Sequence, residues 1–279
     1  MAKKKKTRGR ESRDSRDSRD FLGVRRNVLE EVEAFLSTYI VLPPSTMLVA
    51  ATWTLAAWLL DVWDQFPHLA VTSPSRRCGK TRSLELLAMI TPRADMSCSM
   101  SSSAFYRTIE KERPTVLYDE AQSISRRGSE SSEIIRELLN AGIGRNATVS
   151  RCGGSKGSVV YKFHIYSPKV IALIGELDGV LADRCLPIDL KRKKRSEEVG
   201  RYRLRLVEPI GKQLHDRIEK WARKNKARVC KVYDDLKNLE RFDITNDRLA
   251  DLLEPLIAVL TVVDKTRIDT LREYAERLD

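Results

Sequence analysis

The chain has 279 residues, enough for one domain with a lid or for two small domains around a substantial buried core. Its formal net charge is +12, which favours a polyanionic partner: nucleic acid first, then an acidic protein or a membrane surface. The alternative is a merely basic soluble protein. Five scattered cysteines without a C-x-x-C pair, together with only three histidines, exclude a zinc pattern and a disulfide framework, so we expect a reducing cytoplasmic location.

The first part of the chain divides into a tail and a helical segment. Residues 1–20 contain a tetralysine and three Ser-Arg-Asp repeats, which predict a disordered basic tail with no secretory signal. Residues 21–66 read as an N-terminal helical segment, in which Ser45 or Thr46 is expected to cap a second helix. The apolar run in that helix, residues 47–60, is shorter than the roughly 20 residues that a bilayer needs. It therefore predicts a buried core helix and no membrane span.

Strands alternate with helices over residues 67–195, which predicts a parallel α/β sheet. Residues 196–279 are helical in pattern throughout and predict a helical lid domain. The expected strands and helices of the sheet region follow one another in chain order. The strands are HLAVTS, TVLYDE, KVIALIG and RCLPIDL, and the helices lie at residues 80–90, 104–112 and 131–140.

The stretch TSPSRRCGKTRS, residues 72–83, joins a predicted strand to a predicted helix. It ends like a phosphate-binding loop, although a proline stands where the first glycine is usual. In such a loop the backbone N–H groups and the helix amino end face the phosphates. The lysine reaches the β- and γ-phosphates, and the threonine gives an oxygen to Mg²⁺. We expect the whole loop to bind ATP through Pro74, Ser75, Arg76, Arg77, Cys78, Gly79, Lys80 and Thr81.

Two readings of this loop stay open. It is either a working nucleotide site or a surface turn before a basic helix. The specific role of Arg76 and Arg77 is also open, between contacts to phosphates and contacts to a neighbouring subunit.

A pair of carboxylates follows about forty residues later, in the string TVLYDEA. Asp119 stands at the end of a short apolar strand, where a carboxylate can hold Mg²⁺, and Glu120 can orient or deprotonate an attacking water. An Asp-Glu pair alone often only begins a helix, but its order and spacing after the loop favour a working site. The pair predicts ATP hydrolysis, with Thr81 and Asp119 at the metal and Lys80 and Glu120 in catalysis.

Several strings together resemble one family. SPSRRCGKTRSLELL, AFYRTIEKERPTVLYDEA, LLNAGIGR, SPKVIALIGELDGVLADRCLPIDLKRK and NDRLADLLEPL are similar to phage and mobile-element P-loop ATPases of unknown function. These ATPases occur attached to or near primase and helicase modules. More broadly the strings resemble the AAA+ class, over roughly residues 45–260. The resemblance implies an AAA+-like sheet with a preceding helical segment and a C-terminal helical lid.

The resemblance also implies roles for residues outside the loop. Arg184, in the string LADR, falls where such proteins place an arginine finger that acts across a subunit boundary; the alternative is an ordinary salt bridge. Arg248, in NDRLAD, looks like the nucleotide-contacting arginine called sensor two. The strand in the string KVIALIGEL ends in Gly175 and Glu176, without the Asn or Thr that would serve as sensor one.

The string ATVSRCGGSKGSVVYKF predicts a β-hairpin around a glycine-rich turn. It lies where hexameric viral and minichromosome-maintenance helicases insert a hairpin with a basic tip. By that resemblance Lys156 would contact the nucleic-acid backbone, together with Arg151 or Lys162. Such binding would weaken steeply with salt. The alternative is a plain surface hairpin.

Together these features predict a DNA-associated, helicase- or translocase-like ATPase that uses ATP and Mg²⁺. It would assemble as a homo-oligomeric ring or filament on single-stranded DNA, without sequence specificity, with a primase or another replication protein as candidate partner. The second hypothesis is an ATP-switched assembly factor on DNA with slow hydrolysis. A third, a DNA-binding module with a decayed ATPase core, is disfavoured by the intact Lys-Thr and Asp-Glu pairs.

Overall fold

The structure is a computed structural model that describes most of the chain. The predicted basic tail and two predicted site residues, Glu120 and Lys156, lie outside the described residues. The described residues are 26–97, 102–119, 130–153, 159–175, 177, 179–194, 196–235 and 244–279.

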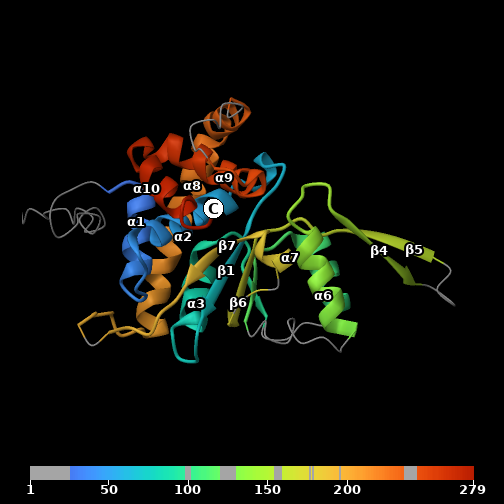
Figure 1. The fold of residues 1–279 in the computed structure, drawn as a ribbon, viewed down its shortest axis with the longest axis horizontal. Helices are drawn as coiled ribbons and strands as arrows, with labels where there is room; N and C mark the ends of the chain where they lie inside the picture. Colours follow the sequence, from blue (N-terminus) through green and yellow to red (C-terminus); the bar gives the residue numbers. More distant parts are fainter. Residues whose placement is uncertain are drawn as a thin grey trace, which may run out of the picture.

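A five-stranded parallel sheet lies at the centre of the described chain (Figure 1). In spatial order its strands are β2 (Asp95–Ser97), β3 (Val116–Tyr118), β6 (Lys169–Ile174), β1 (His68–Ser73) and β7 (Cys185–Asp189). Every pair is parallel, so all carboxyl ends meet at one edge of the sheet, here called the carboxyl edge, and all amino ends at the opposite amino edge. The predicted parallel α/β sheet is confirmed.

Helices cover both faces of this sheet. Alternate residues of a strand point to opposite faces, so Leu69 and Val71 join one core while Ala70 joins another. The first face packs against α3 (Lys80–Ile90), whose bounds match the predicted helix. The second face packs against the three helices α4 (Ser102–Glu112), α6 (Glu130–Ala141) and α7 (Gly179–Ala182).

The remaining helices gather on the α3 side of the sheet (Figure 1). Their buried side chains form one core with the first face, so the predicted segments 21–66 and 196–279 pack on one another. The elements are α1 (Val28–Ser37), α2 (Pro44–Ala57), η2 (Leu60–Val62), α8 (Leu204–Asp234), α9 (Asp247–Val263), η5 (Lys265–Arg267) and α10 (Ile268–Ala275).

Helix α2 is the apolar helix that the sequence predicts, and it is buried along almost its whole length, as expected for a core helix. The indole of Trp53 donates a hydrogen bond to the Pro67 carbonyl at 2.8 Å, which ties α2 to the start of β1. The expected serine or threonine cap is wrong. Pro44 occupies the first helical position, which its fixed φ suits, so Ser45 lies inside the helix. No helix among the described residues is long and apolar enough to cross a membrane.

The predicted hairpin is formed by β4 (Thr148–Gly153) and β5 (Val159–His164), which pair antiparallel and extend away from the sheet (Figure 1). Its base is anchored, because Val149 is buried opposite Phe163, whose ring centroid lies 4.5 Å from that of Tyr106 on α4. The two arms are therefore held by the body of the protein.

Candidate functional site

The loop of residues 74–79 connects β1 to α3 at the carboxyl edge. Gly79 ends the loop with φ 96°, a left-handed conformation that glycine adopts without steric cost. Arg77 is also left-handed, with φ 64°. The first N–H groups of α3 have no carbonyl partner within their helix, and the helix dipole adds positive potential there. The loop and helix start thus form a place where an anion is stabilised.

Lys80 lies across this loop. Its Nζ donates to Ser73 Oγ at 2.6 Å and to the Ser75 carbonyl at 3.4 Å, and Ser73 Oγ in turn donates to the Ser75 carbonyl at 2.7 Å. The ammonium is therefore aimed into the loop and is half-buried there. Ser73 is a site residue that the sequence argument missed, because a serine at a strand end carries no signal of its own.

Thr81 and Asp119 meet at the same edge although they are far apart in sequence. Thr81 Oγ1 donates to Asp119 Oδ2 at 2.8 Å. Asp119 directly follows β3, and its strand reaches the loop because β6 alone separates β3 from β1. A hydroxyl and a carboxylate oxygen are donors of the kind that Mg²⁺ prefers. The predicted pair of metal-binding residues is thus brought together beside Lys80.

The other predicted loop residues differ in exposure. Pro74, Ser75, Arg76 and Arg77 are exposed at the carboxyl edge, where a ligand can reach them. Cys78 is buried, and its Sγ lies 3.4 Å from Ser75 Oγ. Its side chain therefore packs beneath the loop, and only its backbone is available to a phosphate.

The end of β6 touches the loop as well. The N–H of Gly175 donates to the Ser73 carbonyl at 3.0 Å, and Gly175 is left-handed with φ 87°. Neither Ile174 nor Gly175 has a polar side chain, so these two residues can contact a ligand at the loop only through their backbone.

Arg184 lies at the amino edge, away from the loop of its own chain. It precedes Cys185, which pairs with His68 at the start of β1, whereas the loop follows the end of β1 roughly 17 Å along the strand. Arg184 Nε donates to the Asn140 carbonyl at 2.7 Å, and Nη1 donates to the Val180 carbonyl. The structure therefore does not join Arg184 to Lys80 of the same chain.

Arg248 lies beside Arg184 and is likewise remote from the loop. Its Nη1 is 3.8 Å from Asp183 Oδ2, in the first turn of α9 next to the start of β7. Desolvation, and then the nearby charge of Arg248, lower the pKa of Arg184. The sequence predicted that Arg248 contacts the nucleotide. In the structure Arg248 lies with Arg184 at the amino edge, because the amino end of α9 packs against the start of β7.

The two described basic residues of the hairpin, Arg151 and Lys162, lie on opposite faces of it. Arg151 Nη2 is 3.0 Å from Glu137 Oε2, and its guanidinium carbon is 5.7 Å from the ring centroid of Tyr106. Arg151 thus packs back onto α6 and α4. Lys162 pairs opposite Ser150, on the other face of the hairpin, and is exposed. Of the predicted nucleic-acid contacts that the structure describes, Lys162 is the one presented to solvent.

These features define an α/β protein with a parallel central sheet and a loop at its carboxyl edge that joins β1 to α3. A family described as "Protein of unknown function (DUF3631)" matches residues 189–278. This match begins at the last residue of β7 and runs through α8, α9 and α10, so it contains none of the loop residues. Comparison with the curated proteins gave no match.

Proposed function

We propose that this protein is an AAA+-like P-loop ATPase that acts on DNA. The observation that carries the proposal is the hydrogen bond between Thr81 and Asp119, formed beside Gly79 and Lys80. A surface turn before a basic helix has no need of a carboxylate from a distant strand at this position. A nucleotide site needs such a carboxylate, because the metal that neutralises the phosphates requires oxygen ligands from the protein as well as from the phosphates.

The residues of the loop have distinct tasks in this proposal. The backbone N–H groups at the start of α3 bind the phosphates, and Lys80 exchanges its bond to Ser73 for the β- and γ-phosphates. Thr81 and Asp119 would hold Mg²⁺, which supplies positive charge against the phosphate oxygens. Glu120 follows Asp119 in sequence and is proposed to orient the attacking water.

The position of Arg184 supports assembly of several copies. An arginine at the amino edge can act only on the nucleotide of another copy, so the proposed site is completed in a homo-oligomeric ring or filament. The net charge of +12 and the exposed Lys162 on the projecting hairpin support single-stranded DNA, bound by its backbone without sequence specificity. A primase or another replication protein is the proposed further partner.

One observation favours a second function, an ATP-switched assembly factor with slow hydrolysis. The end of β6 contacts the loop through the backbone of Gly175 and offers no polar side chain there from residues 174 and 175. A site that cannot sense the γ-phosphate through this strand would bind ATP well and hydrolyse it slowly.

Steady-state ATP hydrolysis with and without single-stranded DNA separates these functions. The native chain is compared with Glu120→Gln and with a matched control, Glu276→Gln, at the exposed end of α10. DNA-stimulated turnover that is lost only in Glu120→Gln supports the DNA-dependent ATPase. ATP binding with negligible turnover, whatever the DNA, supports the switch. A native chain that binds no ATP contradicts both.

A further inference from the structure

A cavity of about 810 Å³ lies at the amino edge of the sheet, between that edge and helices α2 and α8. Its position is opposite to the loop: Arg113 precedes β3 and lines the cavity, whereas Asp119 follows β3, roughly 20 Å further along the strand. Five cationic side chains line it: Arg93, Arg113, Arg145, Arg223 and Lys226.

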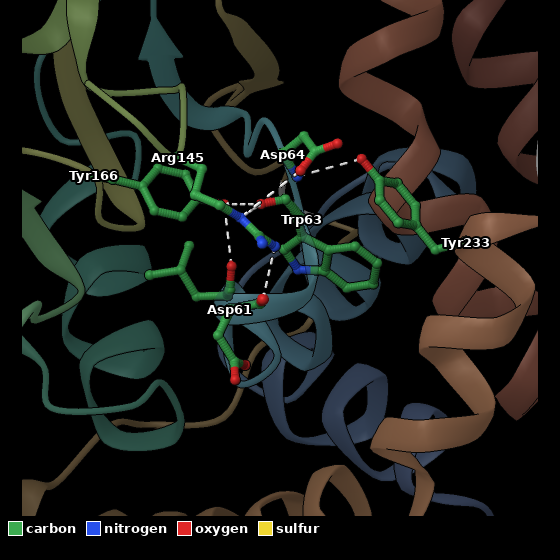
Figure 2. Close-up of polar contacts among 7 residues, drawn as sticks. Asp61, Trp63, Asp64, Arg145, Tyr166 and Tyr233 are labelled. Atoms are coloured by element: carbon green, nitrogen blue, oxygen red, sulfur yellow. Dashed lines mark hydrogen bonds and ion pairs between the residues drawn. The ribbon is translucent and has the colours of Figure 1, made fainter.

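Three of these cations are neutralised within the protein. Lys226 pairs with the Asp61 carboxylate, and Arg223 Nη2 lies 2.7 Å from Glu219 Oε1. Figure 2 shows Arg145 directed at the turn that follows α2. Its Nη2 donates to the Asp61 carbonyl at 2.7 Å, and its Nε lies 3.8 Å from an Asp64 carboxylate oxygen. Lys226 and Arg145 hold α8 and the segment after α6 to that turn, whereas Arg223 is paired within α8.

Arg93 and Arg113 are different. Both side chains are exposed, and within the part of the chain that the structure describes neither makes an ion pair. Both residues have φ 45°, a left-handed conformation that is unfavourable for arginine. Arg93 Nη2 donates to the Arg113 carbonyl at 3.1 Å, so the two turns lie together.

The turns are fixed by their neighbours. Thr115 Oγ1 donates to the Pro92 carbonyl at 2.9 Å, and the Thr115 carbonyl accepts from the N–H of Asp95 at 2.8 Å. The protein therefore holds two cavity-lining arginines in strained backbone conformations, and the lining carboxylates, Asp61 and Glu219, are already paired. The fork of N–H donors on an arginine side chain matches the geometry of phosphate oxygens.

The wall beside them is aromatic. Trp58 donates from Nε1 to the Ile90 carbonyl at 2.9 Å, and its ring meets that of His215 edge-on, with centroids 4.7 Å apart. We propose that this cavity is a second phosphate-binding site, in which Arg93 and Arg113 bind the phosphate groups and Trp58 and His215 form the adjoining wall. The phosphate belongs either to a nucleic-acid strand or to a free nucleotide or pyrophosphate. This proposal does not depend on the ATPase proposal, because the two sites lie at opposite edges of the sheet.

The test uses the full chain with Lys80→Ala, which removes the lysine of the loop site. In that background Arg93→Asn and Arg113→Asn are combined, because asparagine tolerates the left-handed conformation and leaves the backbone in place. The control combines Lys224→Gln and Arg228→Gln, which remove the same charge from exposed positions of α8 that do not line the cavity. Binding is measured by fluorescence anisotropy with labelled single-stranded DNA, and by calorimetry with ATP and with pyrophosphate.

We expect the asparagine variant to bind at least one of these probes about tenfold or more weakly, and the control to stay within about twofold. Loss in the DNA arm identifies a strand as the source, and loss in the ATP or pyrophosphate arm identifies a free phosphate compound. Equal weakening in both variants, or no weakening in either, overturns the proposal.

A second measurement needs no substitution in the cavity. Phenylglyoxal modification of the Lys80→Ala chain, read by mass spectrometry, reports on each arginine separately. A bound probe is expected to protect Arg93 and Arg113 while leaving Arg228 modified. If all three arginines are modified equally with and without the probes, the cavity does not bind phosphate.

Discussion

The two edges of the sheet hold positive charge in different ways. At the carboxyl edge, residues 74–81 form one continuous loop, and a single distant carboxylate joins it. At the amino edge, the cations come from separate segments: Arg93 and Arg113 precede two strands, while Arg184 and Arg248 precede β7 and begin α9. A site made from consecutive residues is visible in the sequence, whereas one assembled from separated residues becomes visible only in the fold.

The edges nevertheless share a property. The three described non-glycine residues with positive φ are all arginines: Arg77 in the loop, and Arg93 and Arg113 at the cavity. A left-handed arginine costs roughly 1–3 kcal/mol and persists only where the surroundings enforce it. Both edges therefore place a strained guanidinium-bearing residue where we propose that phosphate is bound.

The largest effect is expected where Arg184 at the amino edge of one copy completes the nucleotide site at the carboxyl edge of another. Lys80→Ala and Arg184→Ala should each lower ATP turnover by about 10³-fold, because each removes one half of a shared site. Mixing the two variants in equal amounts should restore activity at about one quarter of the interfaces, where an intact Lys80 meets an intact Arg184. The measurement is ATPase activity of each variant alone and of the mixture.

The control is a mixture of Lys80→Ala with Thr81→Ala. Both changes lie in the same half of the site, so no activity should return. If the first mixture also stays inactive, then Arg184 acts only by holding the Asn140 and Val180 carbonyls of its own chain. In that case the two edges do not meet in the assembly.

The second prediction concerns a buried lysine at the amino edge. Lys169, the first residue of β6, donates from Nζ to the carbonyls of Gly142, Ile165 and Ser167 at 3.0–3.1 Å. Desolvation lowers the pKa of Lys169 to about 7. Between pH 7 and its ordinary pKa of 10.5 the unfolded chain holds a proton there that the folded chain has released. The free energy of unfolding therefore rises with pH in this range, by up to about 1.4 kcal/mol per pH unit.

Denaturant unfolding of the native chain and of Lys169→Met, at pH 7.0, 7.75 and 8.5, measures this effect. The window lies above the lowered pKa of the buried His68 and below the ordinary pKa of cysteine, 9.0 for Cys185. Methionine is an unbranched side chain one atom shorter than lysine and does not titrate, so the variant should lack the rise. Equal slopes in the two proteins would show that Lys169 keeps its proton throughout.

The sequence predicted the carboxyl edge well for a physical reason. Glycine, lysine and threonine at this spacing favour a turn followed by a helix start, and α3 begins at Lys80. Thr81, the next residue of that helix, donates a hydrogen bond to Asp119. The parallel sheet followed from the alternation of strands and helices. Strand β2 was missed because three residues, Asp95–Ser97, show no apolar period.

The amino edge could not be predicted in the same way. Arg93 and Arg113 lie next to prolines in sequence, but nothing in either segment tells that the two turns are hydrogen-bonded to each other. The position of Arg248 depends on how α9 packs among the other helices, which a resemblance to a motif does not supply. Tertiary packing, rather than local pattern, decided both outcomes.

The smallest predicted effect concerns whether the strained backbone at Arg93 and Arg113 serves phosphate binding or stability. Glycine adopts φ 45° without the steric cost, so Arg93→Gly and Arg113→Gly should each raise the free energy of unfolding by about 1 kcal/mol, less the entropy that glycine adds to the unfolded chain. Arg223→Gly removes the same charge from the same cavity but lies inside α8, where glycine lowers stability by about 1 kcal/mol. Thermal unfolding of the three variants shows whether each substitution raises or lowers the free energy of unfolding. If Arg93→Gly and Arg113→Gly raise stability and weaken phosphate binding while Arg223→Gly lowers stability, the two strained arginines destabilise the fold and serve binding. A loss of stability in all three would mean that Arg93 and Arg113 are structural residues like Arg145.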